Sequence, residues 1–112
     1  MEKELHQKVC VACEGTEAPL TEAEITPLLS QVSAWQVEDN IKIKKEFTFK
    51  NFSRAINFVN QVAKIAEKEG HHPDVLIHSY KKVLITLSTH AISGLSENDF
   101  ILASKIDRIN LD

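Results

Sequence analysis

The stretch Glu67–His90 reads EKEGHHPDVLIHSYKKVLITLSTH, and the rest of the chain is organised around it. It joins the end of a helical pattern to two runs rich in β-branched residues, Val75–Tyr80 and Val83–Thr89, with Lys81-Lys82 as their short connection. Because Pro73 cannot continue a helix, the stretch predicts a helix followed by a β-hairpin. It also holds four of the five histidines, so we expect the catalytic or binding residues to lie in it.

A long amphipathic helix is predicted before this stretch, with Asn51 as its N-cap and its end near Gly70. Its apolar residues form two adjacent stripes, so the apolar arc is wider than docking on one sheet requires. The helix is either central in its own core or shared with another subunit. We favour a homodimer or homotetramer formed through the helix 51–69, whose stripes are Phe52, Ile56, Val59 and Ala63, and Phe58, Val62 and Ile65.

The residues upstream of that helix predict a shorter helix and a first hairpin. Thr21-Glu22-Ala23-Glu24 has the form of a capping box, in which the threonine and the last glutamate satisfy each other's free backbone amides. A helix is therefore expected from Thr21 to near Ser33. Apolar and polar residues then alternate from Trp35 to Phe49 around a turn at Asp39-Asn40, which is typical of a hairpin with one wet face.

The C-terminal residues predict a third helix. Ala91–Gly94 is expected to form a loop, and Ser96-Glu97-Asn98-Asp99 repeats the capping pattern before a helix whose apolar side carries Leu102, Ile106 and Ile109. The fold class that follows is α+β: a four-stranded, largely antiparallel sheet with three helices packed on one face, in α-β-β-α-β-β-α order. We expect one domain over residues 1–112, with residues 1–19 as a loop-like N-terminal arm.

Composition limits the functions that this domain can have. With 112 residues, 43% hydrophobic and 26% charged, the chain is that of an ordinary globular domain. The net charge of −3 gives no electrostatic reason to expect a nucleic acid or an anionic membrane as partner. No segment reads as a secretory signal or a membrane span, so the expected location is cytoplasmic.

The two cysteines, Cys10 and Cys13, form a CxxC pair near the N-terminus. Such a pair can be a redox dithiol or half of a zinc site. A loop-like run follows it here instead of a helix, and the chain has no second CxxC. We therefore interpret the pair as part of an ordinary N-terminal arm.

Three histidines are expected to converge. His71 and His72 lie where the long helix ends, and His90 ends the last predicted strand. Glu67, one helical turn before His71, is placed to orient or charge one of the rings. Histidine exchanges protons near neutral pH and is also a common metal ligand, so the cluster predicts an acid–base site or a metal site.

Simpler explanations exist for each of these residues. The His-His-Pro run can be a helix stop without function, and Asp99 can act only as a helix cap. His6 and His78 have no obvious partner, and Tyr80 reads more often as a packing residue than as a catalytic one. Adjacent histidines rarely aim both rings at one ion and no HExxH pattern is present, so no metal site is predicted.

The spacing of these residues resembles the signature of the pterin-4a-carbinolamine dehydratases. That family includes the animal dimerisation cofactor of a hepatocyte homeodomain transcription factor. The segments CEGTEAPL, FTFKNF, LSTH and GLSENDF also resemble family features, so the likeness covers nearly the whole chain. The residues of the signature are Glu67, His71, His72, Pro73, Tyr80, His90 and Asp99.

The resemblance implies an enzyme without a cofactor that dehydrates 4a-hydroxytetrahydropterin to quinonoid dihydropterin. It thereby recycles the pterin of aromatic amino-acid hydroxylases. His71 and His90 would transfer protons, and His72 would bind and polarise the pterin. The remaining implied substrate-binding residues, which support the site or shape its turn, are Pro73, Glu67 and Asp99. The alternative is a non-catalytic partner-binding module that uses the face of the helix 51–69.

Overall fold

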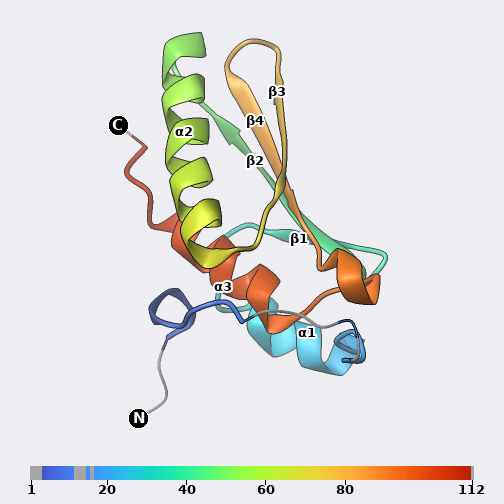
Figure 1. Ribbon diagram of the computed structural model, residues 1–112. Helices are drawn as coiled ribbons and strands as arrows, with labels where there is room; N and C mark the ends of the chain where they lie inside the picture. Colours follow the sequence, from blue (N-terminus) through green and yellow to red (C-terminus); the bar gives the residue numbers. More distant parts are fainter. Residues whose placement is uncertain (1–3, 12–14, 16, 112) are drawn as a thin grey trace.

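The computed structural model describes residues 4–11, 15 and 17–111. It has the predicted α+β fold, in which a four-stranded antiparallel sheet is combined with three α-helices in the expected order (Figure 1). Among the described residues, no helix has the length and apolar character that a membrane span requires. The elements are η1 (Leu5–Gln7), α1 (Glu22–Leu29), β1 (Gln36–Glu38), β2 (Lys42–Thr48), α2 (Phe52–Glu69), β3 (Asp74–His78), β4 (Lys82–Leu87), η2 (His90–Ile92) and α3 (Glu97–Asp107).

The sheet has the strand order β1-β2-β4-β3, so the two hairpins meet along β2 and β4. Alternate residues of these central strands are buried on the face that the helices cover, where Ile43 pairs with Leu87 and Phe47 with Val83. Figure 1 shows α2 running beside the sheet and α3 crossing near the end of α2. The C-terminal end of α2, the exit of β4 and the beginning of α3 therefore meet at one edge of the molecule.

The predicted helix caps are confirmed. Thr21 and Glu24 form a capping box at the start of α1, and the Asn51 side chain accepts the Arg54 amide at the start of α2. Ser96 and Asp99 form the third cap. The first helix is shorter than predicted, because α1 ends at Leu29 instead of near Ser33.

The second hairpin turns earlier than predicted. The first turn, at Asp39-Asn40, is confirmed, and both of its residues have positive φ angles. The predicted Lys81-Lys82 connection is wrong: Ser79 and Tyr80 have φ angles of 50° and 52°, and Lys82 already pairs with His78. Serine and tyrosine are not favoured in this left-handed region, so local preferences did not mark the turn.

The predicted loop at residues 91–94 also needs correction. It contains the end of the short helix η2, and its last residue, Gly94, pairs with Thr89 in an isolated β-bridge. The N-terminal arm likewise contains one turn of 3-10 helix, η1, whose Leu5 is buried in the core. Both segments are thus held against the domain.

The end of α2 is set by Gly70, which has a φ angle of 66°. The amides of Gly70 and His71 both donate to the carbonyl of Ala66, which closes the last turn of the helix. Glycine adopts this left-handed conformation without the steric cost of a Cβ atom. The chain can therefore turn sharply and lead the histidine pair to the edge of the domain.

Candidate active site

A cavity of about 270 Å³ lies where the ends of α2, β4 and α3 meet. All three histidines that the sequence singled out contribute to its lining, although they come from two separate parts of the chain. The other parts of the wall include the N-terminal arm and the first turn of α3. The cavity lining includes His71, His72, His90, Thr89, Asn98 and Val11.

His71 is held by a buried carboxylate. Its Nε2 lies 2.6 Å from Oδ1 of Asp99, and the two side chains are 12% and 0% exposed. The other oxygen, Oδ2, accepts hydrogen bonds from the hydroxyl of Thr89 at 2.8 Å and from the amide of Ser96 at 3.0 Å. Because a carboxylate can only accept, this pairing makes Nε2 of His71 the donor and leaves Nδ1 as the nitrogen that can exchange a proton.

Thr89 and Ser96 extend this network, and sequence reasoning gave neither of them a role in the site. The Thr89 hydroxyl donates to Asp99, so it accepts from the Ser96 hydroxyl, 2.7 Å away. The buried Asp99 is consequently satisfied by three elements at once: the end of α2, the end of β4 and the cap of α3. Asp99 is both the capping residue and the partner of His71, two explanations that the sequence had kept apart.

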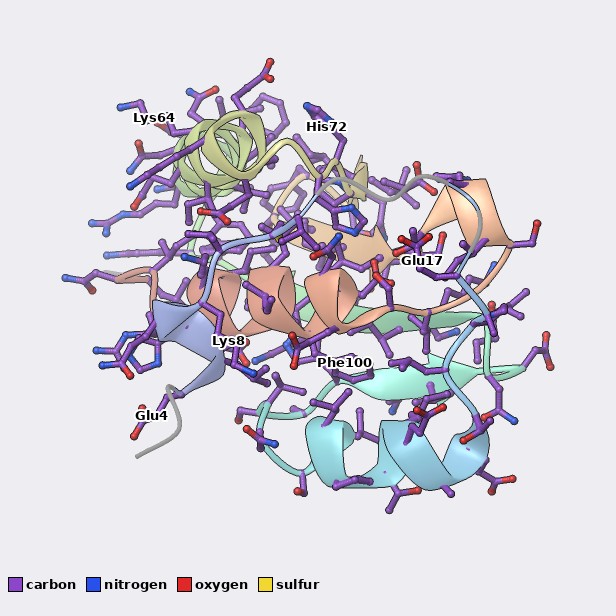
Figure 2. The ribbon with its side chains drawn as sticks, turned by 60° about the horizontal axis from the view of Figure 1, so that its bottom comes forward. Glu4, Lys8, Glu17, Lys64, His72 and Phe100 are labelled. Atoms are coloured by element: carbon purple, nitrogen blue, oxygen red, sulfur yellow. The ribbon has the colours of Figure 1, made fainter. Side chains whose placement is uncertain are left out.

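His90 and His72 occupy more open positions. His90 is the first residue of η2 and is exposed at the cavity wall. Within the described part of the chain, no hydrogen bond holds its ring. His72 is 63% exposed, and its Nε2 lies 3.2 Å from Oε2 of Glu67, which is 78% exposed. Figure 2 shows His72 projecting outward from the chain just after α2.

Not every residue of the predicted signature lies in the cavity. Pro73 and Glu67 are absent from its lining, although Glu67 contacts His72 and Pro73 leads into β3. Tyr80 lies in the turn between β3 and β4 and is 61% exposed. His78, expected to be a bystander, bonds to Oε2 of Glu46 at 2.7 Å on the open side of the sheet.

The thiol of Cys10 lies beside the site, 3.6 Å from the carbonyl of Asn98. Burial, followed by the nearby Glu69 carboxylate, raises the pKa of Cys10 to about 12. Its CxxC partner, Cys13, lies outside the described residues. Among the residues that the structure describes, no group of three or more histidine, cysteine, aspartate or glutamate side chains is arranged to hold a metal ion.

Comparison with known proteins places this sequence in a family. The model of the pterin 4 alpha carbinolamine dehydratase family matches residues 18–109, which include every histidine of the cavity. A protein of Alkaliphilus metalliredigens, provisionally named pterin-4-alpha-carbinolamine dehydratase, is 46% identical over 93% of this chain and 94% of its own. A Legionella pneumophila protein with the same provisional name is 45% identical over the full length of both chains.

Solved structures agree with these sequence matches. The structure described as a transcriptional coactivator/pterin dehydratase from Brucella melitensis is 39% identical, with a TM-score of 0.73 over 79% of this chain and 94% of the other. A pterin dehydratase-like protein described as a RuBisCO assembly factor in the alpha-carboxysome shares the fold, with a TM-score of 0.56 at 22% identity. From the family match and the identity along the whole chain, we conclude that this chain belongs to the pterin-4a-carbinolamine dehydratase family.

Proposed function

We propose that this protein dehydrates 4a-hydroxytetrahydropterin, the 4a-carbinolamine, to quinonoid dihydropterin by histidine acid–base catalysis. The observation that carries the proposal is the cavity lined by His71, His72 and His90, in which the buried Asp99 orients His71. Membership of the dehydratase family supports the same reaction. In a cell with an aromatic amino-acid hydroxylase, the reaction would recycle the pterin cofactor.

The reaction needs one acid and one base. The bond between carbon 4a and its hydroxyl breaks, and that hydroxyl leaves as water after it takes a proton from the acid. The neighbouring ring nitrogen gives its proton to the base, and its electron pair forms the new double bond to carbon 4a. One proton is supplied and one is removed, so the reaction requires no oxidant, reductant or net proton uptake. Two imidazoles can perform both transfers, because a histidine ring can donate a proton in one form and accept one in the other.

The arrangement of the site supports a different role for each histidine. His71 and His90 are the proposed proton-transfer residues: Asp99 fixes the ring of His71, while the ring of His90 is free to meet a substrate. His72, with Glu67 beside it, is proposed to bind and polarise the pterin. The tight turn at Gly70 and the restricted backbone of Pro73 keep His71 and His72 at the end of α2.

A direct assay of 4a-carbinolamine loss tests the proposal. The His71→Gln and His90→Gln variants should each lose about a hundredfold to ten-thousandfold in rate, the usual contribution of general acid–base catalysis. Glutamine at position 71 can still donate to Asp99, which protects the fold from an unpaired buried carboxylate. His78→Gln is the matched control and should keep full activity. Full activity in both site variants, or none in the native protein, would contradict the proposed function.

The surface of α2 supports a second proposal, that two or more copies of this chain associate through it. Ala55, Phe58, Val62 and Ala66 are buried in the domain core, which uses one side of the helix. On the neighbouring stripe, Phe52 is 52% exposed and Ala63 is exposed, while Ile56 and Val59 are only partly buried. An apolar stripe left at the surface is typical of an association site.

The same stripe is the surface that a non-catalytic partner-binding module would use. Analytical ultracentrifugation of the native protein and of a Phe52→Ser, Val59→Ser variant separates the possibilities. A native dimer or tetramer that the double substitution converts to monomer would support self-association. A native protein that stays monomeric at high concentration and lacks dehydratase activity would favour the partner-binding module instead.

A further inference from the structure

Two helices bind the backbone of the N-terminal arm beside the proposed active site. The amide of Cys10 donates to Oε1 of Glu69, at the end of α2, over 2.8 Å. The amide of Val11 donates to Oδ1 of Asn98 over 3.0 Å, and Nδ2 of Asn98 donates back to the Val11 carbonyl over 2.7 Å. Asn98 therefore pairs with Val11 through two reciprocal hydrogen bonds, as a neighbouring strand would.

Both side chains that hold the arm are buried. Asn98 is 6% exposed as a residue, and the side chain of Glu69 is 4% exposed, with Nζ of Lys105 3.4 Å from its second oxygen. Buried polar groups are costly unless they are hydrogen-bonded, so each of them favours the arm in its bound position. The arm is thus attached through specific partners, whereas its Lys8–Glu97 ion pair is partly exposed.

The attached part of the arm forms a wall of the cavity. Val11 and Asn98 both line it together with the three histidines. They also line a second hollow of about 210 Å³, between the arm and the first turns of α3, so they separate the two spaces. The first turn of α3 therefore holds His71 through Asp99 and the arm through the preceding residue.

We propose that Asn98 is a positioning residue for substrate binding: through Val11 it fixes the N-terminal arm as one wall of the pterin cavity. This inference rests on the proposed dehydratase function. Asn98 takes no part in proton transfer, since its side chain is occupied by the Val11 backbone. A wall that contacts the substrate equally before and during the reaction contributes to binding and leaves the chemical step unchanged.

The first test compares the Asn98→Ala variant with the native protein in dehydration kinetics and in binding of a stable dihydropterin. Loss of the paired hydrogen bonds should raise KM and Kd by about fivefold or more and keep kcat within about twofold. The Val11 amide should also lose protection from hydrogen exchange. Lys8→Ala is the matched control, because it breaks an arm–α3 contact away from the cavity; its KM and Kd should not change.

A second variant keeps the test decisive if Asn98→Ala does not fold. Val11→Gly removes a side chain of a residue that is 70% exposed, so the fold should tolerate it while KM and Kd rise. If the native protein is active and its Asn98→Ala or Val11→Gly variant keeps the native KM and Kd, the proposed role of the arm is overturned while the proposed dehydratase function stands. A change confined to kcat, or an equal rise in KM for Lys8→Ala, would overturn the role of the arm as well. A native protein without dehydratase activity or dihydropterin binding would overturn the proposed function and this inference together.

Discussion

Two histidine–carboxylate pairs in this protein have nearly the same length and different surroundings. His71 and Asp99 are 2.6 Å apart with side chains 12% and 0% exposed, whereas His78 and Glu46 are 2.7 Å apart with side chains 35% and 41% exposed. The distance between the two partners therefore does not distinguish a site from a surface contact. The burial of the side chains and the other hydrogen bonds of the carboxylate distinguish the two pairs.

The buried pair belongs to a network that joins distant segments, whereas the only further hydrogen bond of the exposed pair among the described residues is that of Nδ1 of His78 with the hydroxyl of the adjacent Ser79. Asp99 also accepts from Thr89 and Ser96, so its carboxylate joins three elements of the fold. The partly exposed side chains of Glu46 and His78 lie on the face of the sheet opposite the buried residues, where water solvates both groups. Breaking a buried hydrogen-bonded charge leaves unpaired groups behind, while an exposed pair contributes little because water replaces either partner.

The largest effect is expected from breaking the buried pair. Asp99→Asn places an amide where the carboxylate accepts three hydrogen bonds, so at least one donor loses its partner. The free energy of unfolding should fall by about 3 kcal/mol, measured by urea denaturation. The proposed dehydratase activity should fall by about a hundredfold, because His71 is no longer held in one orientation. Unchanged stability would show that the network is not what holds this edge together.

Glu69 is a second buried carboxylate, and its partners differ from those of Asp99. Burial acts to raise the pKa of Glu69, but the Cys10 amide and the Lys105 ammonium outweigh it and hold the pKa below its ordinary value of 4.5. A carboxylate with a lowered folded-state pKa stabilises the fold above its unfolded-state pKa, and that contribution is lost as the pH falls through the folded-state value.

The Glu69→Gln variant should therefore be less stable than the native protein at neutral pH. The difference should shrink as the pH is lowered below about 4.5, because the carboxylate of the unfolded chain then binds a proton before that of the folded protein does, and it should disappear once the pH is below the lower folded-state pKa. Denaturation midpoints across pH 3–7 measure this. Glu97→Gln, which alters the exposed pair with Lys8, is the control. A stability difference that does not depend on pH would show that the charge of Glu69 is unimportant for the arm.

The smallest effect is expected from the exposed pair. Glu46→Gln and His78→Gln should each change the free energy of unfolding by about 0.5 kcal/mol or less and leave dehydratase activity at the native level. Thermal unfolding together with the same activity assay checks this. A loss comparable to that of Asp99→Asn would mean that pair distance, and not burial, determines the contribution.

Local patterns predicted the parts of the fold that depend on neighbours in sequence. The caps at Thr21, Asn51 and Ser96 were correct, because the residues of each cap are close along the chain. The second hairpin was displaced since Ser79 and Tyr80 adopt left-handed angles that their side chains do not favour. The pairing of β3 with β4 on either side of these two residues imposes the turn.

The sequence also predicted the three histidines of the cavity, since helix and strand endings could be read from it. It did not predict the role of Thr89, although that residue stands directly before His90. Nor did it predict that Asn98 and Glu69 would hold the arm, because their partners are 87 and 59 residues away along the chain. Polar residues near the ends of helices are usually solvated. The burial of Asn98 and Glu69 is visible only in the tertiary structure.

By itself, then, the sequence determined the order of elements, the helix caps, the alternation that builds the sheet and the identity of the histidines, because each of these depends on spacing along the chain. The tertiary structure decided which carboxylate is buried against His71, which histidine pair is only a surface contact, and where the arm lies. These outcomes depend on which groups lose contact with water when distant segments pack together. The types of residues and their spacing along the chain do not specify which groups lose contact with water. This loss of contact with water gives Asp99 a different role from Glu46.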